Sequence, residues 1–203
     1  MICAIILASG HSSRFNNQTP KQFHQLNGRI MLDYPVQTFS ECSEIDKIII
    51  VVPKEKLTTI QAKYPHHKVV AGGSSRRESS YNGLKACSPE TEKVLIHDAA
   101  RALVDNATII RCLNDLNNAE AVSTVMPTKD TVVEANINII VNMPDRNLMY
   151  LEQTPQGFLY QTLLKAHTII KAETTDDIRL VKEMGIECKV VEGSEQNFKI
   201  TTQ

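Results

Sequence analysis

Short apolar runs rich in Ile and Val recur along the chain and are separated by segments long enough for a helix. The clearest runs lie within residues 2–7, 47–53, 93–97 and 120–125, each of which contains consecutive apolar residues. A strand that is apolar at every position is buried on both faces, as in a parallel sheet covered by helices. The alternation of such strands with helices predicts an α/β sandwich with right-handed crossovers.

Helices are predicted where apolar residues recur at helical spacing, at 30–41, 76–86, 106–118, about 158–171 and about 176–184. Thr175 or Asp176 would cap the last helix, and Gly185 lies just past its end. Strands at 187–192 and 198–202 are predicted to close the chain.

The pattern changes after residue 127. Residues 130–143 contain two β-prone runs about a turn with Asn136 and Asn138, which predicts a hairpin arm over about 130–145. An apolar arm on a chain this small would be exposed if it were alone. We therefore expect a homodimer that forms through the arm.

Composition restricts the partners and the compartment. Lys and Arg number 22 against 23 Asp and Glu, so nothing predicts a nucleic-acid or membrane surface. No apolar stretch approaches the ~20 residues of a membrane-spanning helix. The N-terminal apolar run ends at Ser9-Gly10 without a basic region, unlike a signal peptide. The five scattered cysteines indicate reduced thiols. We expect a cytoplasmic protein with one domain over residues 1–203.

A loop of small polar residues follows the first strand and contains Ser9, Gly10 and Arg14, with Lys21 further on. Backbone N–H groups in such a loop can approach phosphate oxygens, and two cations can neutralise a polyphosphate. The loop matches neither the P-loop nor the dinucleotide glycine fingerprint. The alternative is an ordinary loop with a solvated Arg14 and Lys21.

Two further segments have residues suited to a nucleotide site. Gly72-Gly73-Ser74-Ser75 leads into a predicted helix N-terminus, where free backbone donors can meet a base or phosphate. The alternative there is a tight turn with an N-cap serine. Asp98 follows the strand at 93–97, where open α/β sheets place their ligands, and its carboxylate suits Mg²⁺. A surface pair between Asp98 and Arg101 is the alternative.

Taken in order, these segments resemble the 2-C-methyl-D-erythritol 4-phosphate cytidylyltransferase family and its relatives, the ribitol-5-phosphate cytidylyltransferases. The resemblance covers nearly the whole chain, through Ala-x-Gly-x-x-x-Arg, Pro-Lys-Gln-Phe, Gly-Gly, His-Asp-Ala-Ala-Arg, Asp-Arg-Asn, Thr-Pro-Gln, Thr-Asp-Asp, Val-Glu-Gly and Asn-x-Lys-Ile-Thr. It implies a Rossmann-like three-layer sandwich of the nucleotide-diphosphosugar transferase type, with a mostly parallel sheet and a protruding hairpin arm. It also implies a final helix that the sequence lacks before Gln203, which we interpret as truncation or as a piece of a longer bifunctional polypeptide.

The resemblance also implies roles for individual residues. The nucleotide contacts would be Ala8, Ser9, Gly10, Gly73, Ser74, Arg76, Ser79, Asp98 and Ala99. The catalytic cations would be Arg14, Lys21 and Lys199, and Asp98 would bind Mg²⁺ or another divalent cation. The sugar phosphate would meet Arg101, Thr131, Arg146 and Lys199. Thr131 and Arg146 flank the arm, which interlocks two subunits in this family, so they would serve the partner's site.

The expected reaction is transfer of CMP from CTP to 2-C-methyl-D-erythritol 4-phosphate, in isoprenoid precursor synthesis. The products would be 4-diphosphocytidyl-2-C-methyl-D-erythritol and pyrophosphate. The first alternative is the same chemistry on D-ribitol 5-phosphate, which makes CDP-ribitol for cell-surface polymers. The second is a non-catalytic nucleotide-binding module, since a fold alone does not fix function.

Overall fold

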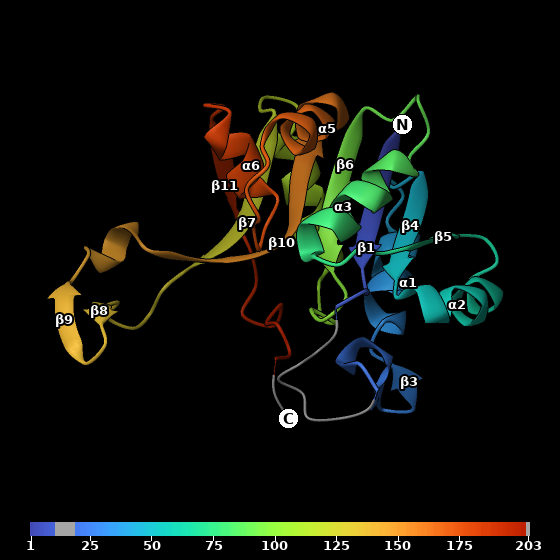
Figure 1. Ribbon diagram of the computed structural model, residues 1–203, viewed down its shortest axis with the longest axis horizontal. Coiled ribbons are helices and arrows are strands. Elements are labelled where there is room, and N and C mark those ends of the chain that lie inside the picture. Colours follow the sequence, from blue (N-terminus) through green and yellow to red (C-terminus); the bar gives the residue numbers. More distant parts are fainter. Residues whose placement is uncertain (11–18, 202–203) are drawn as a thin grey trace.

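A central sheet organises the chain, as seen in a computed structural model that describes residues 1–10 and 19–201 (Figure 1). Within those residues the sheet has seven strands in the order β11-β7-β10-β6-β1-β4-β5. Their bounds are β1 Ile2–Leu7, β4 Lys47–Val52, β5 Lys68–Ala71, β6 Lys93–Asp98, β7 Ala121–Pro127, β10 Tyr150–Leu159 and β11 Cys188–Glu192. The sheet is mostly parallel, as predicted, because only β10 runs antiparallel to its neighbours β6 and β7.

Helices cover both faces of this sheet (Figure 1). The helices α1 (Asp33–Glu41), α2 (Leu57–Lys63) and α4 (Asn106–Asp115) contribute to one apolar cluster. The helices α3 (Arg76–Lys85), α5 (Tyr160–Ile169) and α6 (Ile178–Glu183) contribute to the other. In β1, Ala4 and Ile6 belong to the first cluster and Cys3 and Ile5 to the second. The strand is apolar at every position because both of its faces are buried.

Strand β10 is the main departure from the sequence-based expectation, which assigned a helix from about residue 158. Residues 150–159 form a central strand instead, and α5 begins only at Tyr160. The segment contains Pro155, which cannot donate to a strand ladder, together with several polar residues. The pairing of β10 with β7 shifts in register between Glu152 and Gln156, and this irregularity accommodates the proline.

Other boundaries also differ from the prediction. The predicted helix at 30–41 begins at Asp33, because residues 29–30 form strand β3 (Arg29–Ile30), paired with β2 (Gln25–Leu26). The short helix α2 was not predicted. The strand predicted at 198–202 is wrong for its described residues, 198–201, which form no strand. The helix α6 ends as predicted, with Gly185 at φ +79° just beyond it.

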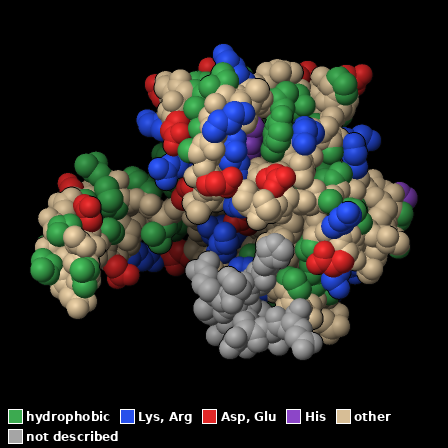
Figure 2. Space-filling model, viewed as in Figure 1, with side chains coloured by type: hydrophobic (Ala, Val, Ile, Leu, Met, Phe, Trp, Pro, Cys, Tyr) green, Lys and Arg blue, Asp and Glu red, His purple; other side chains and the backbone are tan. Residues whose placement is uncertain are grey.

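A hairpin arm extends from the body of the chain (Figure 1) and confirms the hairpin predicted over about 130–145. It consists of β8 (Glu134–Asn136) and β9 (Ile139–Asn142), and η3 (Arg146–Leu148) follows on the return path. Apolar side chains are prominent on the arm in Figure 2, and Ile137 at its tip is 92% exposed. Among the described helices, none is long and apolar enough to cross a membrane.

Helix α3 packs closely against the sheet at Gly83. A Cβ atom there would lie 2.5 Å from Ile5 Cγ2 and 3.1 Å from Val51 Cγ2. We therefore expect Gly83→Ala to lower the free energy of unfolding by about 1–3 kcal/mol, although alanine favours helices. Urea unfolding followed by circular dichroism measures this, with the exposed Lys85→Ala as a control that stays within about 0.5 kcal/mol. Full stability of Gly83→Ala would show that α3 can move away from the sheet.

Candidate active site

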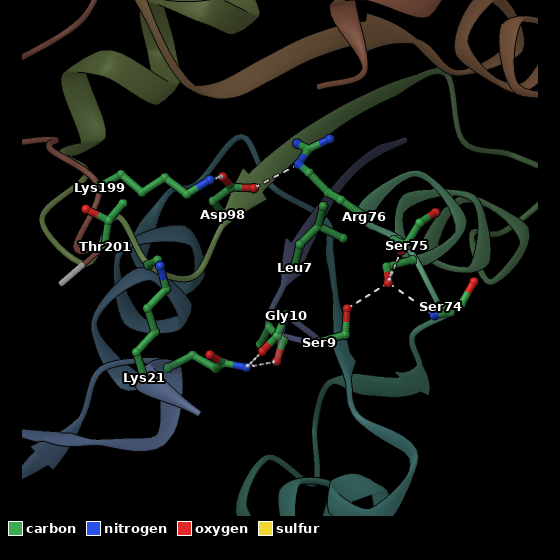
Figure 3. Close-up of a pocket in the computed structure, with 15 residues that line it drawn as sticks. Leu7, Ser9, Gly10, Lys21, Ser74, Ser75, Arg76, Asp98, Lys199 and Thr201 are labelled. Atoms are coloured by element: carbon green, nitrogen blue, oxygen red, sulfur yellow. Dashed lines mark hydrogen bonds and ion pairs between the residues drawn. The ribbon is translucent and has the colours of Figure 1, made fainter. Parts of the chain in front are cut away.

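A cleft of about 310 Å³ opens where β1 and β6 end and α3 begins (Figure 3). The carboxyl ends of parallel strands and a helix N-terminus meet there, which is where open α/β sheets bind anionic ligands. The 3-10 helix η1 (Lys21–Phe23) and the C-terminal segment complete the walls. The lining residues are Leu7, Ala8, Ser9, Gly10, Lys21, Gln22, Gly73, Ser74, Ser75, Arg76, Ser79, Asp98, Ala100, Lys199 and Thr201.

The loop after β1 is held in place by a buried glutamine. Gln22 Nε2 donates to the carbonyl of Ala8 at 2.6 Å and to that of Gly10 at 2.9 Å. Ser9 Oγ donates to Ser79 Oγ at 2.7 Å, which links this loop to α3. The start of the loop is therefore fixed by side chains from two other segments before any ligand binds.

The segment before α3 approaches its neighbours too closely for a side chain at either glycine. A Cβ atom on Gly72 would lie 2.4 Å from Ser9 Cβ, and one on Gly73 would lie 2.2 Å from Glu78 Cγ. The Gly73 N–H donates to Ser79 Oγ at 3.1 Å. These contacts require glycine at both positions and hold the backbone beside the cleft.

Ser75 caps α3, since its hydroxyl accepts from the Glu78 N–H at 3.1 Å. The N-cap role considered as an alternative is therefore present, and Ser75 also lines the cleft. The carboxylate of Glu78 accepts from both the N–H and the hydroxyl of Ser74, each at 2.7 Å. The helix N-terminus at the cleft is thus ordered by local hydrogen bonds.

Asp98, the last residue of β6, lies at the centre of the charged groups in the cleft (Figure 3). Arg76 Nε lies 3.3 Å from Asp98 Oδ1, and Lys199 Nζ lies 2.6 Å from Oδ2. Burial alone would raise the pKa of Asp98, but the charges of Arg76, Lys199 and Arg101 hold that pKa well below its usual value. Asp98 is therefore ionised at neutral pH, and the surrounding cations leave a positive excess suited to a polyphosphate.

The side chains around Asp98 could hold a divalent cation only together with ligands that come from a substrate or from water. Among the described residues, no group of three His, Cys, Asp or Glu side chains could hold a metal ion. Mg²⁺ commonly binds through one or two carboxylates, with water and substrate phosphates as its other ligands. The residues present would therefore fit a cation to which Asp98 supplies one carboxylate and a bound phosphorylated substrate supplies further oxygens.

Two of the residues assigned to the site from the sequence lie just outside the lining. Ala99 is fully buried in an apolar cluster. Arg101 donates through Nη1 to the Asn197 carbonyl at 2.8 Å and through Nη2 to the Glu152 carbonyl at 2.9 Å. Arg101 thus ties β10 to the C-terminal segment, although its charge still lowers the pKa of Asp98.

Thr131 and Arg146 do not line the cleft of their own chain. Both are exposed and flank the hairpin arm, which extends from the body of the chain (Figure 1). Arg146 Nη1 donates to the Lys129 carbonyl at 3.2 Å. Arg14 lies outside the described residues.

A profile of the family described as 2-C-methyl-D-erythritol 4-phosphate cytidylyltransferase matches residues 2–203. The chain belongs to this family. Curated relatives with this name include one from Prochlorococcus marinus, 38% identical over 98% of this chain and 91% of the relative. Another, from Clostridium perfringens, is 33% identical over 99% of this chain and 93% of the relative.

Solved structures agree with this assignment and with the fold. The 4-diphosphocytidyl-2C-methyl-D-erythritol synthase from Anaerococcus prevotii matches with a TM-score of 0.88 and 30% identity, over 100% of this chain and 91% of that chain. The bifunctional IspDF from Campylobacter jejuni matches with a TM-score of 0.87 and 28% identity, over 99% of this chain and 52% of that one. The predicted α/β nucleotidyltransferase fold is confirmed.

The cleft of this cytidylyltransferase family member includes residues that the sequence analysis did not assign to it. Gln22, Ser75, Ala100 and Thr201 all line it. The sequence could have indicated Gln22, since its amide lies beside Lys21 within Pro-Lys-Gln-Phe and can donate hydrogen bonds to a nearby loop. Nothing in the sequence placed Ala100 beside the C-terminal segment, where the Ile200 N–H donates to the Ala100 carbonyl at 2.9 Å.

Proposed function

We propose that this chain transfers CMP from CTP to the phosphate of 2-C-methyl-D-erythritol 4-phosphate, releasing pyrophosphate. The observation that carries the proposal is the ionised Asp98 held between Arg76 and Lys199, in a cleft bordered by Lys21 and two small-residue loops. Such a cleft suits a nucleoside triphosphate and its metal ion. Membership of the cytidylyltransferase family supports CTP as the nucleotide and a place in isoprenoid precursor synthesis.

The reaction needs charge stabilisation rather than proton transfer. The acceptor phosphate is mostly dianionic at neutral pH, because its second pKa is about 6. One of its oxygens attacks the α-phosphorus of CTP in line, a new P–O bond forms, and the bond to pyrophosphate breaks. Lys21 and Lys199 would stabilise the negative charge that builds on the phosphates. A divalent cation, bound by Asp98 and the phosphates, would supply further neutralisation.

Pyrophosphate release from CTP and Mg²⁺ tests this function directly. 2-C-methyl-D-erythritol 4-phosphate and D-ribitol 5-phosphate are offered in separate reactions. Faster release with the methylerythritol compound is expected. Release with ribitol phosphate alone would give the chain the other acceptor. CTP binding without release in either reaction would favour a non-catalytic nucleotide-binding module.

We also propose that two copies of the chain pair through their arms. Five apolar side chains on the arm are each more than half exposed, namely Ile137, Ile139, Ile140, Val141 and Met143. Exposed apolar groups gathered on one small element favour burial against a partner, at about 25 cal/mol per Å². In a two-fold symmetric pair each arm would meet the other subunit, which would carry Thr131 and Arg146 to the partner's cleft.

We expect Arg146→Ala to raise the KM for the sugar phosphate by about 10-fold or more and to leave the KM for CTP nearly unchanged. The reason is the loss of a charge-assisted hydrogen bond to a phosphate, which contributes about 1.5–3 kcal/mol. Steady-state kinetics with each substrate varied in turn measure the effect. Arg179→Ala serves as the control, because Arg179 lies on α6 and pairs with Glu183 at 3.3 Å. Equal rises in both KM values would contradict separate sites for the two substrates.

Mixed dimers test whether the arm acts on the partner's cleft. When Arg146→Ala and Lys21→Ala chains are co-expressed, a mixed dimer has one site with an intact cleft and an intact arm, but only if the arm comes from the partner. Activity well above that of either variant alone is then expected. If each arm serves its own chain, every site in the mixture carries a defect and activity is not restored.

A further inference from the structure

A buried network of an arginine, an aspartate and a histidine side chain continues from Arg76 behind the cleft. Arg76 Nη1 lies 2.7 Å from Asp177 Oδ2. His167 Nε2 lies 2.9 Å from the other oxygen of that carboxylate, Asp177 Oδ1. Asp177 has no solvent exposure, and the His167 side chain is 1% exposed. An unpaired carboxylate would be costly at this depth, so Asp177 depends on these two partners.

Three elements hold the Asp177 carboxylate in one position. Asp177 precedes α6, and its backbone N–H donates to Gln156 Oε1 on β10 at 3.1 Å. His167 lies on α5 and stacks on the ring of Tyr81 from α3, with ring centroids 5.4 Å apart and an interplanar angle of 15°. Because each group is fixed by packing or hydrogen bonds, the carboxylate presents a rigid acceptor to Arg76.

The guanidinium of Arg76 is consequently shared between two carboxylates. Its Nη1 makes the shorter contact, with Asp177, whereas only Nε faces Asp98, at the longer distance of 3.3 Å. Figure 3 marks one contact between Arg76 and Asp98 with a dashed line. An arginine and a carboxylate otherwise favour a bidentate salt bridge, in which two N–H groups donate to the two carboxylate oxygens. Arg76 does not form such a bidentate bridge with Asp98, since its Nε contacts Asp98 Oδ1 and its Nη1 contacts Asp177.

We propose that Asp177, oriented by His167, is a positioning residue that keeps Arg76 from forming a bidentate salt bridge with Asp98. The proposal rests on the proposed function, because it assigns Asp98 to the nucleotide and its cation. While Arg76 is held by Asp177, Asp98 Oδ1 has one side-chain contact at 3.3 Å among the described residues and can accept a ligand from the cleft. Without the charge of Asp177, Arg76 can turn both ends toward Asp98 and compete with the bound nucleotide and its cation.

The test is a double-mutant cycle of Asp177→Asn and Arg76→Lys in the full chain. CTP affinity is measured by calorimetry in Mg²⁺ buffer, alongside kcat, the KM for each substrate and the melting temperature. We expect Asp177→Asn to weaken CTP binding and lower kcat/KM for CTP by about 10–100-fold, as for other residues that orient a metal ligand. The KM for the sugar phosphate should change less than about twofold.

The cycle separates positioning from a merely structural role. Lysine at position 76 cannot form a bidentate salt bridge. In the Arg76→Lys chain, adding Asp177→Asn should therefore weaken CTP binding by less than about threefold. Asp33→Asn is the matched control, since Asp33 pairs with Lys63 at 3.1 Å and with Tyr64 outside the cleft. Asp33→Asn should lower the melting temperature and leave CTP affinity unchanged.

Either of two results would overturn the proposal. The first is unchanged CTP affinity in a folded Asp177→Asn chain. The second is an equal loss of CTP affinity on adding Asp177→Asn to the unsubstituted chain and to Arg76→Lys. If Asp177→Asn does not fold, His167→Phe decides, because it keeps a ring beside Tyr81 and removes the donor to Asp177. His167→Phe is expected to lower CTP affinity by less than Asp177→Asn does, again with little change in the KM for the sugar phosphate. His167→Gln keeps a hydrogen-bond donor and should restore CTP affinity. Native CTP affinity in His167→Phe would then overturn the proposal.

The CTP measurement also distinguishes this proposal from the proposed function. An unsubstituted chain that binds CTP but releases no pyrophosphate with either acceptor would contradict the transfer reaction. The cycle on CTP affinity would still decide the role of Asp177. An unsubstituted chain that binds no CTP would overturn both proposals.

Discussion

Lys21→Ala is expected to lower kcat by at least ~10²-fold, the scale seen when one preorganised electrostatic donor is removed. Lys21 begins η1 and lines the cleft, and its Nζ donates to the Ile200 carbonyl at 2.6 Å. That bond connects η1 with the C-terminal segment, so the ammonium is anchored within the cleft. Single-turnover measurement of pyrophosphate release isolates the chemical step from product release.

The control for this variant is Lys54→Ala, which removes an exposed lysine of η2 (Lys54–Lys56) outside the cleft. Its kcat should equal that of the unsubstituted chain. A folded Lys21→Ala protein with near-normal kcat would remove Lys21 from the mechanism. A raised KM for CTP with normal kcat would mean that Lys21 binds CTP equally well in the ground state and the transition state.

Asp98→Asn is expected to lower kcat/KM for CTP by about 10²–10³-fold, because it removes the charge that a divalent cation would meet while keeping the side chain's shape. It also leaves Arg76 and Lys199 without a shared counter-charge. Kinetics at saturating Mg²⁺ and calorimetric CTP titration measure the two effects. Unchanged CTP affinity in the presence of Mg²⁺ would contradict the assignment of Asp98 to the nucleotide site.

The same substitution has a pH-dependent effect on stability. The neighbouring cations lower the folded-state pKa of Asp98 against the effect of burial. Ionised Asp98 therefore stabilises the folded chain above the unfolded pKa of about 3.9, and this contribution is lost as pH falls toward the folded pKa. Asp98→Asn should lower the free energy of unfolding at pH 7 by about 1–3 kcal/mol. The difference from the unsubstituted chain should shrink below about pH 4.

The sequence by itself predicted the parallel part of the sheet and the edge of the cleft at which the parallel strands end. In β1, β4 and β6 the apolar residues are consecutive, because helices cover both faces of each strand. That pattern locates the strand ends, and therefore the cleft edge where Asp98 and the glycine–serine segment lie. The hairpin arm was predictable for a similar local reason, since two short β-prone runs about a turn pair with each other.

The tertiary structure alone decided the central position of β10 and the partners of the charged groups. A polar segment with Pro155 has no strand pattern, and it is stabilised there by pairing with β6 and β7 on either side. Lys199 meets Asp98, and Asp177 meets Arg76, across 101 positions of the chain in each case. Local sequence patterns report which face of an element is buried. They do not report which distant side chains meet, because that depends on the path of the chain between them.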